Sequence, residues 1–114
     1  MKRVPVLGAS LCLAVLLPLS FAQNADKKEK VIGDPKAGAK IFAANCSECH
    51  NADSKEPKEG PGLKGLKDGR LPSGEPATQE EILKLLEEGR EEMPPFPDLT
   101  DEQKHDVSAY VLTL

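Results

Sequence analysis

Two cysteines separated by two residues and followed at once by a histidine stand at Cys46, Cys49 and His50. This spacing is typical of sites at which two thiols form thioether bonds to the vinyl groups of a haem. The histidine directly after the second sulfur is then placed to bind the iron from one face through an imidazole nitrogen. The motif therefore predicts one covalently attached haem c, with Cys46 and Cys49 as anchors and His50 as an iron ligand.

Two other uses of a Cys-x-x-Cys pair fit this sequence less well. A structural zinc site needs two further cysteine or histidine ligands, and only Cys12 and His105 remain in the chain. A thioredoxin-like thiol couple needs a strand–helix–strand context. The sequence around the motif indicates helix, turn and helix instead, with no run of β-branched residues. The spacing therefore favours haem attachment.

The first 22 residues are typical of a secretory signal peptide. A positive start at residues 1–3 precedes an almost wholly apolar stretch over residues 4–19, and the small residues Ser20 and Ala22 favour cleavage after Ala22. Cys12 lies inside the apolar stretch and would be removed with it. The alternative is an uncleaved membrane anchor, because the apolar run is close to the shortest length that spans a bilayer. We expect export to the periplasm, with no stable membrane insertion after cleavage.

The chain after the signal segment predicts one small domain. Residues 23–33 are expected to form a flexible leader, and residues 34–114 the folded domain. Asp34 can cap free backbone amides and Pro35 suits the first helical position, so a helix is expected to run from there to the haem motif. Gly38 is unfavourable in mid-helix, which predicts close approach of another helix. The face expected to pack comprises Ala37, Ile41 and Ala44, with Gly38 and Phe42 beside them.

Two further helices are predicted by capping boxes that begin at Thr78 and Thr100. The first is expected to end at Gly89, and residues 51–75, rich in Gly, Pro, Lys and Asp, are expected to form loops and turns. The predicted class is therefore all-α, with three to four helices. Its apolar positions are Ile82, Leu85, Leu86, Val107, Tyr110, Val111 and Leu114.

Aromatic residues are few in the predicted mature chain. Phe42, Phe96 and Tyr110 remain after residue 22, and there is no Trp. A haem would supply the missing apolar mass, so we expect the polypeptide to fold poorly without it.

The methionine at position 93 stands apart from apolar helix faces. Met93 is the only methionine besides the initiator, in a charged loop followed by Pro94, which disfavours a helical backbone at Met93. A thioether held on an extended segment is a suitable sixth ligand for haem iron and raises its reduction potential. His105 is the competing candidate, but helical periodicity places it opposite the apolar stripe, where it should face water.

Taken in order, these residues resemble the small soluble class I cytochromes c, and the resemblance covers residues 34–114. It implies a small cytochrome c fold wrapped around one haem, in which the first and last helices cross. It also implies that the Pro61 carbonyl accepts a hydrogen bond from His50, and that Leu63 belongs to the haem-binding residues. Lys104 departs from the family, which often has an apolar residue there. The matching elements are Gly38, Phe42, Cys46 to His50, Gly60 to Leu63, Met93-Pro94, Leu99-Thr100 and Ala109 to Val111.

The resemblance implies a monomeric electron carrier rather than an enzyme. With His50 and Met93 both on the iron, no coordination position remains for a substrate, so we expect single electrons to pass between larger redox proteins. One alternative is a dedicated electron-transfer subunit of a periplasmic oxidoreductase. Another is a gas-binding or peroxidatic haem protein with a displaceable sixth ligand.

Charge is distributed unevenly along the chain. Residues 71–114 contain three Lys or Arg against eleven Asp or Glu, whereas residues 23–70 contain ten against eight. Most such charges are solvated helix faces. Glu91 and Glu92 immediately precede the proposed ligand Met93, so they are expected to attract a basic docking patch on a redox partner. Nothing in the sequence indicates binding to nucleic acid.

Overall fold

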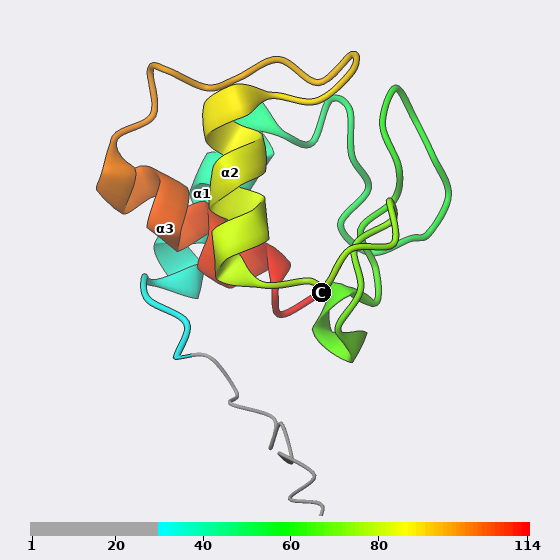
Figure 1. Ribbon diagram of the computed structural model, residues 1–114, viewed down its shortest axis with the longest axis horizontal. Helices are drawn as coiled ribbons and strands as arrows, with labels where there is room; N and C mark the ends of the chain where they lie inside the picture. Colours follow the sequence, from blue (N-terminus) through cyan, green and yellow to red (C-terminus); the bar gives the residue numbers. More distant parts are fainter. Residues whose placement is uncertain (1–29) are drawn as a thin grey trace, which may run out of the picture.

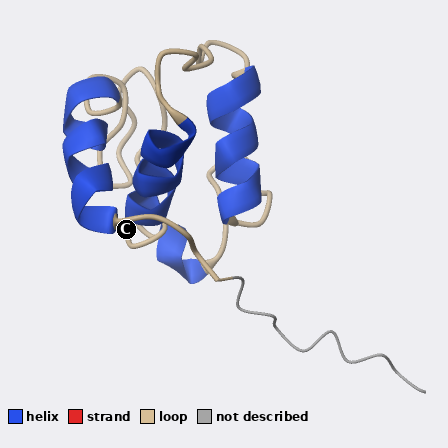
Figure 2. Ribbon diagram, turned by 90° about the vertical axis from the view of Figure 1, so that its left-hand side faces the viewer, coloured by secondary structure: helices blue, strands red, loops and turns tan. Residues whose placement is uncertain are grey.

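The computed structural model describes residues 30–114, so the predicted signal peptide, Cys12 and residues 23–29 of the leader lie outside the described residues. Helices and loops make up this part of the chain (Figures 1 and 2). The elements are α1 (Pro35–Asn45), the 3₁₀ turn η1 (Leu66–Asp68), α2 (Gln79–Glu88) and α3 (Asp101–Val111). The β-bridges found within residues 30–114 are isolated ones, so the all-α prediction is confirmed. No helix in this range has the length and apolar character needed to cross a bilayer.

The helix starts follow the predicted capping chemistry, with one exception. The Asp34 carboxylate accepts from the Lys36 amide at 2.8 Å, and Thr100 forms a complete capping box. At α2 only half of the predicted box is present. The Thr78 hydroxyl accepts from the Glu81 amide, but the Glu81 side chain does not bind the Thr78 amide. The Thr78 amide donates to the Pro76 carbonyl at 2.9 Å instead, which leaves nothing for the Glu81 side chain to satisfy.

Helices α1 and α3 cross at Gly38. Gly38 is buried, and a Cβ atom placed on it would overlap the Asp106 carbonyl of α3 and approach the Tyr110 Cβ to 2.8 Å. One turn further along α1, the rings of Phe42 and Tyr110 meet edge to face, with centroids 5.4 Å apart. The predicted close approach at Gly38 is confirmed. The buried face of α1 is centred on Gly38 and Phe42, and Ala44, expected to pack, is exposed because it points away from the crossing.

Helix α2 lies in front of this crossing in Figure 1, and the loops of residues 51–75 lie to its right. The buried residues Ile82 and Leu86 of α2 pack in one cluster with Val107 and Val111 of α3. Among residues 30–114, the largest side chain that is fully buried is that of Ser108. The apolar core is therefore thin, as the scarcity of aromatic residues predicted. Its buried members are Phe42, Leu66, Leu71, Ile82, Leu86, Val107, Ala109 and Val111.

The buried side chain of Gln79 joins three parts of the chain. Its amide oxygen accepts from the Ile32 amide at 2.8 Å, and its amide nitrogen donates to the Ile32 carbonyl and, at 2.8 Å, to the Ser108 hydroxyl. Residues 32 and 33, predicted as the end of a flexible leader, are thus attached to the domain. The packed part of the chain begins before Asp34, because the Gln79 side chain offers an acceptor to the Ile32 amide and a donor to the Ile32 carbonyl.

We expect Gly38→Ala to destabilise the holoprotein. The added methyl group would push α1 away from the α3 backbone, and overpacking of this kind costs about 1–3 kcal/mol. The free energy of unfolding, measured by urea titration of the ferric protein, should fall accordingly. Lys40→Ala, at an exposed position of the same helix, is the matched control and should change it by less than about 0.5 kcal/mol. A Gly38→Ala protein as stable as wild type would contradict the crossing.

Candidate haem site

The haem motif forms a tight turn that continues the end of α1. The amide of Cys46 donates to the Phe42 carbonyl at 2.8 Å, and the amides of Cys49 and His50 both donate to the Cys46 carbonyl, at 3.1 and 2.9 Å. The helical hydrogen bonding therefore continues into the turn and fixes the motif against α1. Neither motif cysteine takes part in a disulfide within residues 30–114; Cys46 is half-buried and Cys49 is exposed.

The pKa of the Cys46 thiol is shifted in the direction opposite to that of a redox-active cysteine. Burial, and to a lesser extent the neighbouring Cys49, raises the pKa of Cys46 to about 11. Reactive cysteines of thiol–disulfide enzymes have lowered pKa values, because the thiolate is the nucleophile. Within residues 30–114, moreover, no three His, Cys, Asp or Glu residues gather as a structural zinc site would require. The two alternative uses of the motif thus lack support.

The ring of His50 is held by the loop that follows it. Its Nδ1 lies 2.7 Å from the Pro61 carbonyl oxygen, the contact that the resemblance implied. With Nδ1 donating to that oxygen, the tautomer is fixed and the Nε2 lone pair is left free for a metal ion. The loop is itself tied to the motif, because the Gly60 amide donates to the Cys49 carbonyl at 2.9 Å and the Leu63 amide to the Asn51 carbonyl at 2.8 Å.

Met93 lies at the end of a two-residue turn. The amides and carbonyls of Arg90 and Met93 pair at 2.9 and 2.8 Å, with Glu91 in the left-handed region at φ 51°. Gly89 has φ 71° and ψ 177°, a conformation essentially restricted to glycine. A Cβ at Gly89 would also lie 2.7 Å from the Met93 carbonyl oxygen. The sequence predicts Gly89 only as the end of a helix. No feature of the sequence indicates its contact with the Arg90–Met93 turn.

Three of the predicted site residues pack against the same apolar cluster. Cys46, Leu63 and Met93 come from three different segments, and all three are half-buried against the same core. Two thiols, a free imidazole nitrogen and a half-exposed apolar border match the requirements of a covalently bound, largely apolar macrocycle, so these residues fit a haem. Other half-buried apolar residues packed on the core include Ile41, Ala52, Leu85, Phe96 and Tyr110.

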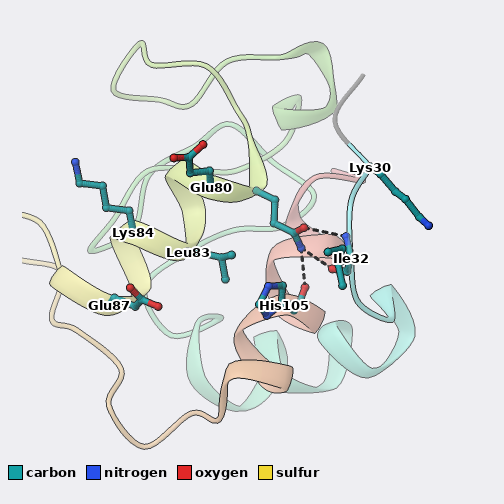
Figure 3. A pocket seen from close by; sticks show the side chains of 8 residues that line it. Lys30, Ile32, Glu80, Leu83, Lys84, Glu87 and His105 are labelled. Atoms are coloured by element: carbon teal, nitrogen blue, oxygen red, sulfur yellow. Dashed lines mark hydrogen bonds between the residues drawn. The ribbon is translucent and has the colours of Figure 1, made fainter. Parts of the chain in front are cut away.

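His105 belongs to a different part of the surface. It is half-buried rather than fully solvated as predicted, because residues 30–32 lie beside it, and its Nδ1 is 2.7 Å from the Asp101 carbonyl oxygen. The ring borders an open groove of about 460 Å³ (Figure 3). None of the groove's lining residues belongs to the haem motif, the Pro61 loop or the Met93 turn; they are Lys30, Ile32, Gln79, Glu80, Leu83, Lys84, Glu87 and His105.

Known proteins match most of this chain. The family model for cytochrome c oxidase, cbb3-type, subunit III matches residues 33–111. Cytochrome c6 of Thermostichus vulcanus is 37% identical over 113 residues, which cover 98% of this chain and 92% of that protein. The crystal structure of cytochrome c6 from the diatom Phaeodactylum tricornutum superposes with a TM-score of 0.57 at 36% identity, covering 71% of this chain and 93% of that one.

A further match is to one part of a larger protein. The cbb3-type cytochrome c oxidase subunit FixP of Sinorhizobium medicae is 33% identical over 105 residues, covering 75% of this chain and 34% of that subunit. The relatives thus share the motif-bearing domain in both free-standing and larger proteins. From the site geometry and the length of these matches, the chain belongs to the small class I cytochromes c, electron-transfer proteins with one covalently bound haem c.

Proposed function

We propose that His50 and Met93 are the two axial ligands of the haem iron, and that the protein carries single electrons between larger redox proteins in the periplasm. The observation that carries the proposal is the 2.7 Å contact between His50 Nδ1 and the Pro61 carbonyl. It leaves Nε2 as the free donor and strengthens it, because a hydrogen bond from the second ring nitrogen raises the basicity of a ligating imidazole.

Two segments of the chain would fill the two axial positions of the iron, as in an electron carrier. The bound haem supplies a one-electron couple. Pro61 fixes the His50 tautomer, and the Arg90–Met93 turn with its Gly89 support holds the thioether on a short, hydrogen-bonded segment. With both axial positions filled by the protein, no position is open to substrate. We therefore infer that it is not an enzyme.

The predicted signal peptide supports the periplasmic location, with residues 1–22 removed on export and an uncleaved anchor as the alternative. A second candidate function is that of a dedicated electron-transfer subunit of an oxidase. The match of residues 33–111 to the cbb3-type subunit III model favours it. Fractionation separates the two: a free carrier is released with the periplasmic contents, whereas a subunit stays with an oxidase complex.

Covalent attachment is expected to depend on both thiols. Cys46→Ala combined with Cys49→Ala should abolish haem-dependent peroxidase staining of the chain on denaturing gels, because no thioether can form. Cys12→Ala is the control and should keep the stain, since that residue lies in the predicted signal peptide. Extraction of the haem from wild-type protein by acidified organic solvent would contradict covalent attachment.

Met93 ligation is expected to give a distinct spectrum. The ferric wild-type protein should show the weak far-red band of thioether-bound iron, and Met93→Ala should lose it completely and bind carbon monoxide in the ferrous state, because its sixth position is open. The potential should also fall, since a thioether ligand raises it. His105→Ala should keep the band. Loss of low-spin character in His105→Ala but not in Met93→Ala would reverse the assignment.

Docking is expected to use the acidic turn next to Met93. Glu91 and Glu92 are exposed, while Arg90 is taken up by an ion pair with Glu75 at 3.0 Å. Hydrogen bonds, first from the Ser73 hydroxyl and then from the Glu75 backbone and Arg90, lower the pKa of Glu75 and keep it ionised for that pair. The two turn carboxylates therefore remain available to a basic partner.

Reversal of Glu91 and Glu92 to Lys should slow electron transfer with a small cationic redox reagent and flatten its salt dependence, because exposed charges act over about 10 Å at 0.1 M ionic strength. Stopped-flow rates at several salt concentrations measure both effects. Reversal of Glu80 and Glu87, which border the groove of Figure 3, changes net charge equally and is the matched control. Equal slowing by both double variants would show that overall charge, and not the Met93 turn, governs encounter.

A further inference from the structure

The backbone of Gly60 lies directly against the His50 ring. A Cβ atom on Gly60 would be 2.6 Å from Cε1, 3.0 Å from Nδ1 and 3.1 Å from Nε2 of that ring. Carbon atoms in contact are normally about 3.5–4.0 Å apart, so any side chain at residue 60 displaces the ring or the loop. Three ring atoms are involved, which means that the contact is with the imidazole itself and not with its Cβ stem.

Neither peptide group next to Gly60 is free to withdraw. The Gly60 amide donates to the Cys49 carbonyl at 2.9 Å, and the Gly60 carbonyl accepts from the Lys58 amide at 2.9 Å. The next residue, Pro61, supplies the carbonyl that binds His50 Nδ1. The loop backbone is thus fixed on both sides of the contact, and movement of Gly60 would disturb the hydrogen bond to the ring.

The hydrogen bond alone does not determine the ring's orientation. The χ2 torsion of histidine is broad, and an imidazole attached at Nδ1 can still pivot about the line that joins Nδ1 to its acceptor. Contact with the Gly60 backbone removes this second freedom. The hydrogen bond sets the tautomer, and the glycine contact sets the plane of the ring.

We infer that Gly60 is a positioning residue for His50: the missing side chain allows the loop backbone to fix the imidazole plane and hence the direction of the Nε2 lone pair. The inference rests on the proposed ligation of the iron by His50. Gly60 acts only through His50. A substituted residue 60 would therefore change how His50 binds, with consequences for the redox equilibrium.

The test uses Gly60→Ala in the full-length holoprotein. We expect the paramagnetic shifts of the haem methyl groups in the ferric state to redistribute, because they report the plane of the axial imidazole. Loss of the hydrogen bond to Pro61 should weaken donation from His50 and favour the ferrous state. Outer-shell changes of this kind alter metal affinity by tenfold or more, and a shift of about tenfold in the one-electron equilibrium raises the potential by about 59 mV.

Gly62→Ala is the matched control. A Cβ on Gly62 would overlap the Ser54 carbonyl and approach the Lys55 carbonyl carbon to 2.5 Å, but none of its three nearest atoms belongs to His50. Both variants should lower the free energy of unfolding, and only Gly60→Ala should move the methyl shifts and the potential. If Gly60→Ala leaves both unchanged, or if Gly62→Ala moves them equally, Gly60 is a packing residue and the inference is wrong.

A measurement on the wild type decides the matter if Gly60→Ala yields no holoprotein. In the diamagnetic ferrous state, the Gly60 α-protons should show a nuclear Overhauser effect to the His50 Hε1 proton, and its absence would overturn the inference. NMR of His50 with isotope-labelled imidazole nitrogens distinguishes failure of the proposed ligation from failure of the positioning role alone. Without hyperfine shifts at His50 in the ferric wild type, ligation itself fails; with shifts that Gly60→Ala leaves unaltered, only the positioning role fails.

Discussion

The close crossing of α1 and α3 at Gly38 is the contact on which the haem site depends. It fixes the axis of α1, whose Phe42 carbonyl holds the Cys46 amide, and the Cys46 carbonyl in turn holds the amides of Cys49 and His50. Without a side chain at Gly38 the two backbones touch, and the edge-to-face pair of Phe42 and Tyr110 closes the crossing on one side. A shift of α1 would therefore move Cys46, Cys49 and the proposed axial ligand His50 together.

The thin core explains why the site is bordered by half-buried apolar residues. A polypeptide of this length buries only a modest fraction of its surface, and the largest fully buried side chain in the described part of the chain is a serine. Ser108 is satisfied by Gln79, so the buried polar pair costs little and joins α2 to α3. Leu63 and Met93 are left half-buried at the edge of this core, and both are proposed haem-binding residues.

Glycine at points of close approach is a recurrent device in this small domain. Gly38 allows two helices to touch, Gly60 lies against the His50 ring, and Gly89 allows the chain to turn beneath Met93. At each point the backbone itself makes the packing contact, because no side chain stands between it and its neighbour. The consequence is that three residues without functional groups govern the placement of those that have them.

The sequence by itself determined the haem motif, the all-α class and the helix starts at Asp34, Thr78 and Thr100, whereas the signal peptide stays a prediction. These depend on covalent spacing or on hydrogen bonds between residues a few positions apart, and such signals are readable in a short window of sequence. The methionine loop was also indicated locally, through Pro94.

Only the tertiary structure decided what lies against these elements. Two contacts could not be read from sequence periodicity: that of Ile32 with Gln79 and that of Gly60 with His50. The half-burial of His105 and the exposure of Ala44 also differ from what helical periodicity predicted. The bond from Ile32 to Gln79 spans 47 positions. Local propensity does not register such contacts, because the two partners meet only when the folded chain brings distant segments together.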